Sequence, residues 1–193
     1  MPVLGIVASQ ISGHLFAPSG AYDSIATVTL GSAATTITLS SIPSTYTHLQ
    51  VRIMARDTTT GVTQTSLRWQ FNGDTASNYT AYHDISGNGG SVGANAFGAN
   101  SIAYLIQVIP GSNASNTTQY GVAILDILDY ASANKNKIVR ALGGYDRNGS
   151  GMVRFGSSMW MNSSTAISSI TFTADGSQYA TGTTVALYGI KGA

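Results

Sequence analysis

The chain has 193 residues, which fits a single domain, and 43% of them are hydrophobic. Charged residues make up 9%, against about 25% in an ordinary soluble protein, and Glu is absent. Helices cover their solvent-facing side with Glu and Lys, so this composition argues against all-α and doubly wound α/β folds. The net charge of +1 comes from scattered cations, and cysteine is absent. These facts exclude a basic nucleic-acid-binding stripe, a disulfide scaffold and thiol chemistry.

The first 22 residues predict an N-terminal docking arm. An apolar lead comes first, and Gly, Pro and Ser then interrupt regular structure. No basic residue precedes the lead, so it does not fit a secretory signal peptide, and no apolar run approaches the roughly 20 residues of a membrane helix. The alternative is that this segment forms the first strand of the domain's own sheet. As an arm, it would dock on a partner through Val3, Leu4, Ile6, Val7, Ile11, Leu15 and Phe16.

Residues 23–193 predict one domain of about ten short strands. In the run 48–56, Leu49, Val51 and Ile53 alternate with polar residues, the period of two that a half-buried strand shows. Turn residues separate this run from other strand-like runs at 24–30, 35–39, 66–71, 79–85, 101–109, 120–130, 137–143, 153–161, 166–173 and 183–190.

Two connections carry specific expectations. Asn72-Gly73 is a strong hairpin signal, and it predicts that the run 66–71 pairs with the run 79–85. Residues 87–100 are rich in Gly, Asn and Ala, and they predict a long loop that packs no core. With no fixed-period repeat and no internal linker, the pattern predicts an all-β fold: a jelly-roll-like antiparallel β-sandwich with an extended N-terminal arm.

Catalytic groups are sparse in this sequence. The three histidines are dispersed, and no G-x-S-x-G elbow occurs. Asp126 and Asp129 are three apart on a predicted strand, so their side chains point to opposite faces and cannot flank one bond or chelate one metal. The sequence therefore predicts that the protein is not an enzyme and needs no cofactor.

Asp146, Asn148 and Ser150 place oxygen ligands at alternate positions, as calcium loops do. A calcium loop of the EF-hand type also needs a bidentate acid further on, and residues 151–155 contain none. A hairpin turn explains the same residues through backbone geometry. We therefore expect no metal site.

Aromatic side chains offer a candidate recognition surface. Flat rings stack on the apolar faces of sugars, and loops rich in Tyr, Ser, Gly and Asn resemble adaptable binding surfaces. The alternative is that most of these rings belong to the core, because they stand beside aliphatic residues in strands. The candidates for glycan binding are Tyr79, Tyr82 and Phe97.

The low charge has a consequence for assembly. A protein with a net charge near zero and few surface ions tends to self-associate, and edge strands rich in Thr, Ser and Val need capping. Copies of the chain or other partners that cover the surface would satisfy both requirements, since they shield the weakly charged surface and cap the edge strands. We therefore expect a homo-oligomer.

Several segments resemble a family of tailed-bacteriophage virion structural proteins. They are LGIVASQISGHLFAPSGAYDSIATVTLG at 4–31, IPSTYTHLQVRIMAR at 42–56, WQFNGDTASNY at 69–79, ILDILDYASANKNKIVRALGGYD at 124–146 and VALYGIKGA at 185–193. The resemblance covers essentially the whole chain. It implies a non-enzymatic component of the virion surface, made in the host cytoplasm, and it supplies no catalytic residues.

Within that setting, we expect a homotrimeric capsid decoration (cement) protein that bridges subunits of the major capsid protein or other virion proteins. The alternative is a tail or head fibre module that binds host surface glycans. A glycan hydrolase would need two carboxyl groups roughly 5–5.5 Å apart in a retaining enzyme, and no such acid pair is evident.

Overall fold

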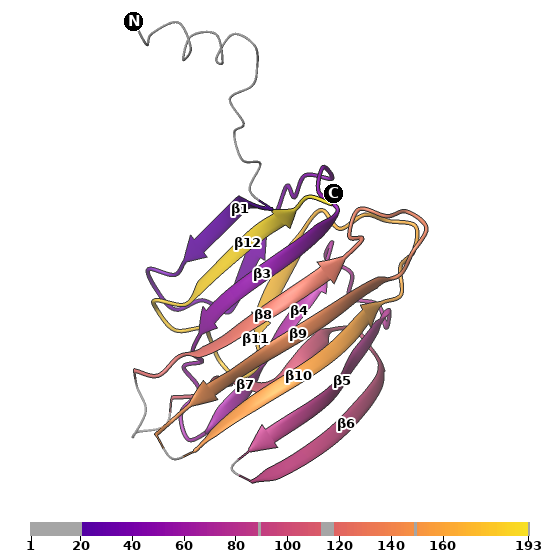
Figure 1. Ribbon diagram of the computed structural model, residues 1–193. Coiled ribbons are helices and arrows are strands. Elements are labelled where there is room, and N and C mark those ends of the chain that lie inside the picture. Colours follow the sequence, from indigo (N-terminus) through magenta and orange to yellow (C-terminus); the bar gives the residue numbers. More distant parts are fainter. Residues whose placement is uncertain (1–20, 89, 113–117, 149, 193) are drawn as a thin grey trace, which may run out of the picture.

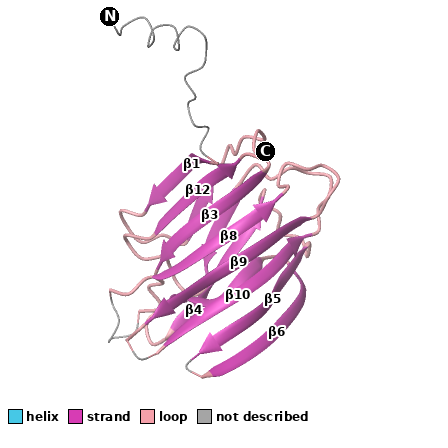
Figure 2. Cartoon of the chain, viewed as in Figure 1, coloured by secondary structure: helices cyan, strands magenta, loops and turns pink. Residues whose placement is uncertain are grey.

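The computed structural model describes residues 21–88, 90–112, 118–148 and 150–192 (Figure 1). Within these ranges the chain forms twelve strands and no helix (Figure 2). The first strand begins at the last residue of the predicted arm. The strands are β1 (Tyr22–Thr29), β2 (Thr36–Leu39), β3 (His48–Ala55), β4 (Gln64–Phe71), β5 (Tyr79–Asn88), β6 (Ser91–Asn100), β7 (Ala103–Pro110), β8 (Gly121–Leu128), β9 (Lys137–Asp146), β10 (Gly151–Trp160), β11 (Ile170–Ala174) and β12 (Thr184–Ile190).

The strands form two antiparallel sheets that pack face to face as a sandwich (Figure 1). The larger sheet has eight strands in the order β1-β12-β3-β8-β9-β10-β5-β6, and the smaller has four in the order β2-β11-β4-β7. Because the larger sheet has twice as many strands, it extends beyond the smaller one on the side of β5 and β6. Its outer face is fully open to view in Figure 1.

The strand pairing is that of a jelly roll with two inserted hairpins. Four antiparallel pairs nest inside one another along the chain: β1 with β12, β2 with β11, β3 with β8, and β4 with β7. The hairpins β5–β6 and β9–β10 interrupt this scheme, and both add their strands to the larger sheet. The predicted jelly-roll-like sandwich is therefore confirmed.

The core lies between the sheets, and the period of two explains which side chains fill it. On β3, Leu49, Val51 and Ile53 are buried, while the alternate Arg52 and Met54 are exposed. This confirms the half-buried strand that the sequence predicts. The largest fully buried side chains include Trp69, Trp160, Tyr79, Tyr130, Tyr179, Phe71 and Phe172.

The predicted hairpin at Asn72-Gly73 is wrong in its partner strand. Both residues have positive φ, 53° and 65°, so the chain does turn there. However, β4 pairs with β11 and β7, and β5 lies in the other sheet. The Asn72 side chain binds the segment before β11: its amide donates to the Ala166 carbonyl at 2.8 Å and its oxygen accepts from the Ser168 N–H at 2.8 Å. These bonds hold the turn beside β11 rather than beside β5.

The predicted loop over residues 87–100 is also wrong, because residues 91–100 form β6. This strand pairs with β5 in unbroken register, from Asn88 opposite Ser91 to Tyr79 opposite Asn100. Small side chains of low strand propensity are tolerated there because β6 buries almost none of them. Backbone pairing with β5 determines its structure instead. The expectation that this segment packs no core is met.

Candidate functional site

The outer face of the larger sheet carries exposed apolar side chains in two adjacent rows that cross the strands. In one row across the sheet, Met54, Val122, Gly144, Val153 and then Gly87 and Val92 lie directly opposite their neighbours. The adjacent row runs through Ile124, Leu142, Phe155 and Ile85. We call the eight large side chains of these two rows the apolar belt: Met54, Ile85, Val92, Val122, Ile124, Leu142, Val153 and Phe155.

The belt is well exposed to solvent. The exposed fraction of its residues ranges from 39% at Ile124 to 82% at Val92. It crosses six strands, from β3 to β6, and since neighbouring strands lie about 4.8 Å apart, it is roughly 24 Å wide. Apolar side chains grouped in this way on a folded surface mark a site where another macromolecule or a ligand binds.

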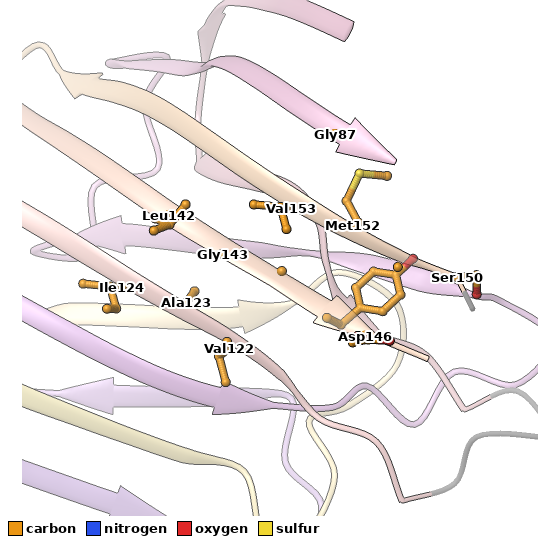
Figure 3. A pocket seen from close by; sticks show the side chains of 13 residues that line it. Gly87, Val122, Ala123, Ile124, Leu142, Gly143, Asp146, Ser150, Met152 and Val153 are labelled. Carbon is orange, nitrogen blue, oxygen red and sulfur yellow. The ribbon is translucent and has the colours of Figure 1, made fainter. Parts of the chain in front are cut away.

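A shallow hollow of about 730 Å³ lies within the belt, between Val122 on β8 and Val153 on β10 (Figure 3). The residue between them in the row is Gly144, which has no side chain and lines the hollow. A Cβ at this position would stand 2.3 Å from the Met152 carbonyl oxygen, so even alanine would force the backbone to move. Asp146 and Ser150 add polar groups at one end of the hollow.

Polar residues border the belt on one side. Gln50 donates to the Asp126 carboxylate at 2.9 Å and accepts from the Arg52 Nε at 2.9 Å. The Arg52 guanidinium also lies over two rings, 5.7 Å from the centre of Tyr22 and 5.2 Å from that of Tyr188. This network holds its charged groups beside the belt rather than across it.

The candidate glycan-binding residues separate into two environments. Tyr82 and Phe97 lie opposite each other on β5 and β6, and their rings stack with centres 6.1 Å apart and an interplanar angle of 10°. Phe97 is half exposed, and Tyr104 of β7 packs against Tyr82 at 5.0 Å. This pair forms a small aromatic surface on the overhanging part of the larger sheet.

Tyr79 does not belong to that surface. It is fully buried and stacks on Trp160, with ring centres 6.4 Å apart. Its hydroxyl accepts from the Phe71 N–H at 2.9 Å and donates to the Asp74 carbonyl at 3.2 Å. Burial raises the pKa of Tyr79 to about 12. The glycan-binding assignment of Tyr79 therefore fails, because no sugar can reach a core residue.

The buried charged groups have structural partners. Arg154 on β10 forms an ion pair with Asp84 on β5, and its other guanidinium nitrogen donates to Gln107 of β7 at 2.7 Å. Lys137 donates to the Asn162 carbonyl at 2.9 Å, and burial lowers its pKa. The Arg154 contacts join β10 to β5 and β7, and the Lys137 contact joins β9 to the segment that follows β10.

The described residues contain no group of three or more His, Asp or Glu side chains placed to hold a metal ion. In the segment of Asp146, Asn148 and Ser150, for which the sequence favours a hairpin turn over a calcium loop, the Asp146 carboxylate accepts from the Asn148 N–H at 2.8 Å. Asp126 and Asp129 are separately engaged: Asp129 pairs with Lys135 at 2.6 Å. Within the described ranges, no helix has the length and hydropathy needed to span a bilayer.

The predicted docking residues of the arm, Val3, Leu4, Ile6, Val7, Ile11, Leu15 and Phe16, lie outside the described residues. The belt was missed by sequence reasoning, although β8 carried a signal. Its sequence GVAILDIL is apolar on both faces, whereas a half-buried strand alternates. That pattern indicates that the outer face of the strand carries apolar side chains as well.

Comparisons with protein-family models, with curated proteins and with solved structures find no match to this chain.

Proposed function

We propose that this chain is a non-enzymatic structural subunit of a protein assembly, and specifically a decoration protein on the shell of a tailed bacteriophage. The apolar belt carries the proposal. In this role the belt lies against the shell, and the subunit stabilises the shell by bridging neighbouring capsid proteins.

The chemistry of the belt supports protein docking over catalysis. Its eight large side chains are apolar, and Asp126 and Arg52 beside them are linked to each other through Gln50. Burying apolar surface contributes about 25 cal/mol per Å², so a face of this kind binds through area and shape rather than through a few polar contacts. A broad, slightly hollowed sheet surface suits another protein surface.

The resemblance to phage virion proteins supplies the setting, and the composition agrees with it. Charged residues make up only 9% of the chain. Electrostatic repulsion between copies is therefore weak, and the surface associates readily with other protein surfaces. A subunit that is covered on one face in its assembly can keep such a surface without aggregating.

The first experiment counts copies per virion by quantitative gel densitometry against the major capsid protein. Hundreds of copies support a shell component. A handful of copies, in multiples of three or six, contradicts decoration of the shell and indicates a tail or vertex position.

A substitution in the belt tests the docking face directly. We expect Leu142→Lys, at the centre of the belt, to fold normally because Leu142 is already half exposed, and to bind particles assembled without the protein at least tenfold more weakly. Thr38→Lys is the matched control, since Thr38 is exposed on the outer face of the smaller sheet. Equal binding by both variants would refute the belt as the docking face.

A second candidate, a fibre module that binds host glycans, is favoured by the half-exposed Phe97 ring stacked on Tyr82. Under this function, a glycan array detects binding by the wild-type protein, and Phe97→Ala abolishes the signal while Leu142→Lys retains it.

A further inference from the structure

Strand β6 leaves one edge of the larger sheet unpaired. Among the described residues its one neighbour is β5, so the N–H and C=O groups of every second residue point away from the sheet. These groups can form a ladder with another strand. The ten residues of β6 are exposed or nearly so along the whole strand.

The other three sheet edges each carry a feature that discourages such pairing. β1 has an irregular register between Ser24 and Ala26, and its Asp23 forms an ion pair with Lys191 at 2.7 Å. β2 is only four residues long. β7 pairs irregularly with β4, contains Gln107 at a φ of 55° and ends in a proline. Bulges, charges, short strands and proline are the devices that protect sheet edges.

β6 has none of these devices. Its sequence, SVGANAFGAN, contains neither a charged residue nor proline, and its register with β5 is regular from end to end. Its side chains are small except for Val92 and Phe97, so a second strand can approach without steric obstruction. In the part of the chain that the structure describes, the strand is therefore open to pairing along its full length.

We propose that β6 pairs antiparallel with β6 of a second copy of this chain, so that two larger sheets join across a two-fold axis. Side chains along a strand point alternately to the two faces of the sheet, and residues directly opposite each other in a strand pair point to the same face. The outer faces of the two sheets therefore form one continuous surface only if the numbers of the paired residues add up to an even number. A register centred on Asn95 meets this condition.

The centred register is also favoured by the side chains it brings together. Phe97 of one copy lies opposite Gly93 of the other, so each ring covers a position that lacks a side chain. Ala94 lies opposite Ala96, and Asn95 faces its own equivalent. The sequence around Asn95 is thus complementary to itself, which indicates a second copy rather than an unrelated strand.

The proposal is independent of what the apolar belt binds, and it goes beyond the decoration function. A seam of one strand pair lies at the small end of protein interfaces, below about 1,200 Å². We therefore expect a weak dimer, with a dissociation constant in the micromolar range, that is reinforced when subunits are held side by side in an assembly.

Sedimentation velocity of the full-length chain over a range of concentrations tests the seam. We expect a monomer–dimer equilibrium, and we expect the double variant Ala94→Lys/Ala96→Lys to weaken it at least tenfold by placing like charges opposite each other. Thr27→Lys is the matched control, because Thr27 is exposed on β1 at the opposite edge of the same sheet. A monomer at every concentration, or an oligomer that the double variant leaves intact, overturns the proposal.

A cross-linking experiment tests the register without relying on a charged variant. The chain has no cysteine, so Asn95→Cys introduces a single thiol. Residues opposite each other in an antiparallel pair have Cβ atoms about 4.5–5.5 Å apart, close enough for a disulfide after small adjustment. We expect Asn95→Cys to form a disulfide dimer much faster than the control Thr27→Cys. Equal rates would exclude this register.

Discussion

The ion pair between Asp84 and Arg154 is the most buried charged contact among the described residues. The Arg154 side chain is 6% exposed and that of Asp84 is fully buried. Arg154 also donates to Gln107, so it links two strands of the larger sheet to β7 of the smaller one. The pair lies where the inserted strands pack against the jelly roll, and it fixes how the sheets meet there.

We expect Asp84→Ala to lower the free energy of unfolding by about 3–5 kcal/mol, because it leaves the Arg154 charge buried and unpaired. The double variant Asp84→Leu/Arg154→Met removes both charges and should recover most of that loss. Chemical denaturation of the three proteins measures the difference. A loss below about 1 kcal/mol in the single variant would show that Arg154 finds water or another acceptor.

At the scale of elements, most strands could be predicted from the sequence. The partner strand of β4 was predicted wrongly, and β6 was expected to be a loop. Alternation located β3, because a strand that buries one face shows a period of two in its sequence, and turn residues delimited most of the other strands. The partner of β4 could not be predicted, since Asn72 directs the turn through bonds to a segment nearly a hundred residues later. β6 was missed because an edge strand that buries no side chain carries no alternation. The belt was missed as well, although β8, which is apolar on both faces, carried a signal for it.

The connection between β4 and β5 depends on Asp74. Its carboxylate accepts from the Trp160 indole at 2.7 Å and from the Asn78 amide at 2.9 Å, and it also accepts from the Ala76 N–H. Partial burial acts to raise the pKa of Asp74, but these hydrogen bonds outweigh it and hold the pKa below the usual 3.8. The ionised form is therefore the one that the folded protein favours.

We expect Asp74→Ala to destabilise the fold by about 1–3 kcal/mol at neutral pH, because it removes acceptors from Trp160 and from the connection. A folded-state pKa below the unfolded one means that the contribution is complete above about pH 4–5 and is lost as the pH falls through the folded value. Asp74→Asn should flatten this acid dependence. Thermal melts between pH 2.5 and 7 measure it, and parallel curves for wild type and Asp74→Asn would contradict it.

At the scale of the whole molecule, the nested pairing makes the fold slow to form. The outermost pair joins opposite ends of the domain, with Tyr22 opposite Ile190. Folds dominated by such distant contacts reach the native state in milliseconds to seconds, because loop closure must precede stabilising contacts. The inserted hairpins are local and can form before the jelly roll closes.

We expect the main refolding phase to last about 0.1–10 s at 25 °C. Stopped-flow fluorescence can follow it, since Trp69 and Trp160 are both buried in the core and report its closure. Complete recovery of native fluorescence within about a millisecond would be inconsistent with closure of β1 on β12 as a late step.

The pairing of β1 with β12 also places the first and last described residues of the domain close together at one corner. Asp23 and Lys191 form an ion pair there, at the edge of the larger sheet farthest from β6. The described chain therefore begins and ends at the edge opposite β6, so a domain joined directly at residue 21 or 192 would not compete for space with β6. The fold therefore suits use as a display scaffold, and a short linker between the two ends would permit circular permutation without crossing either sheet.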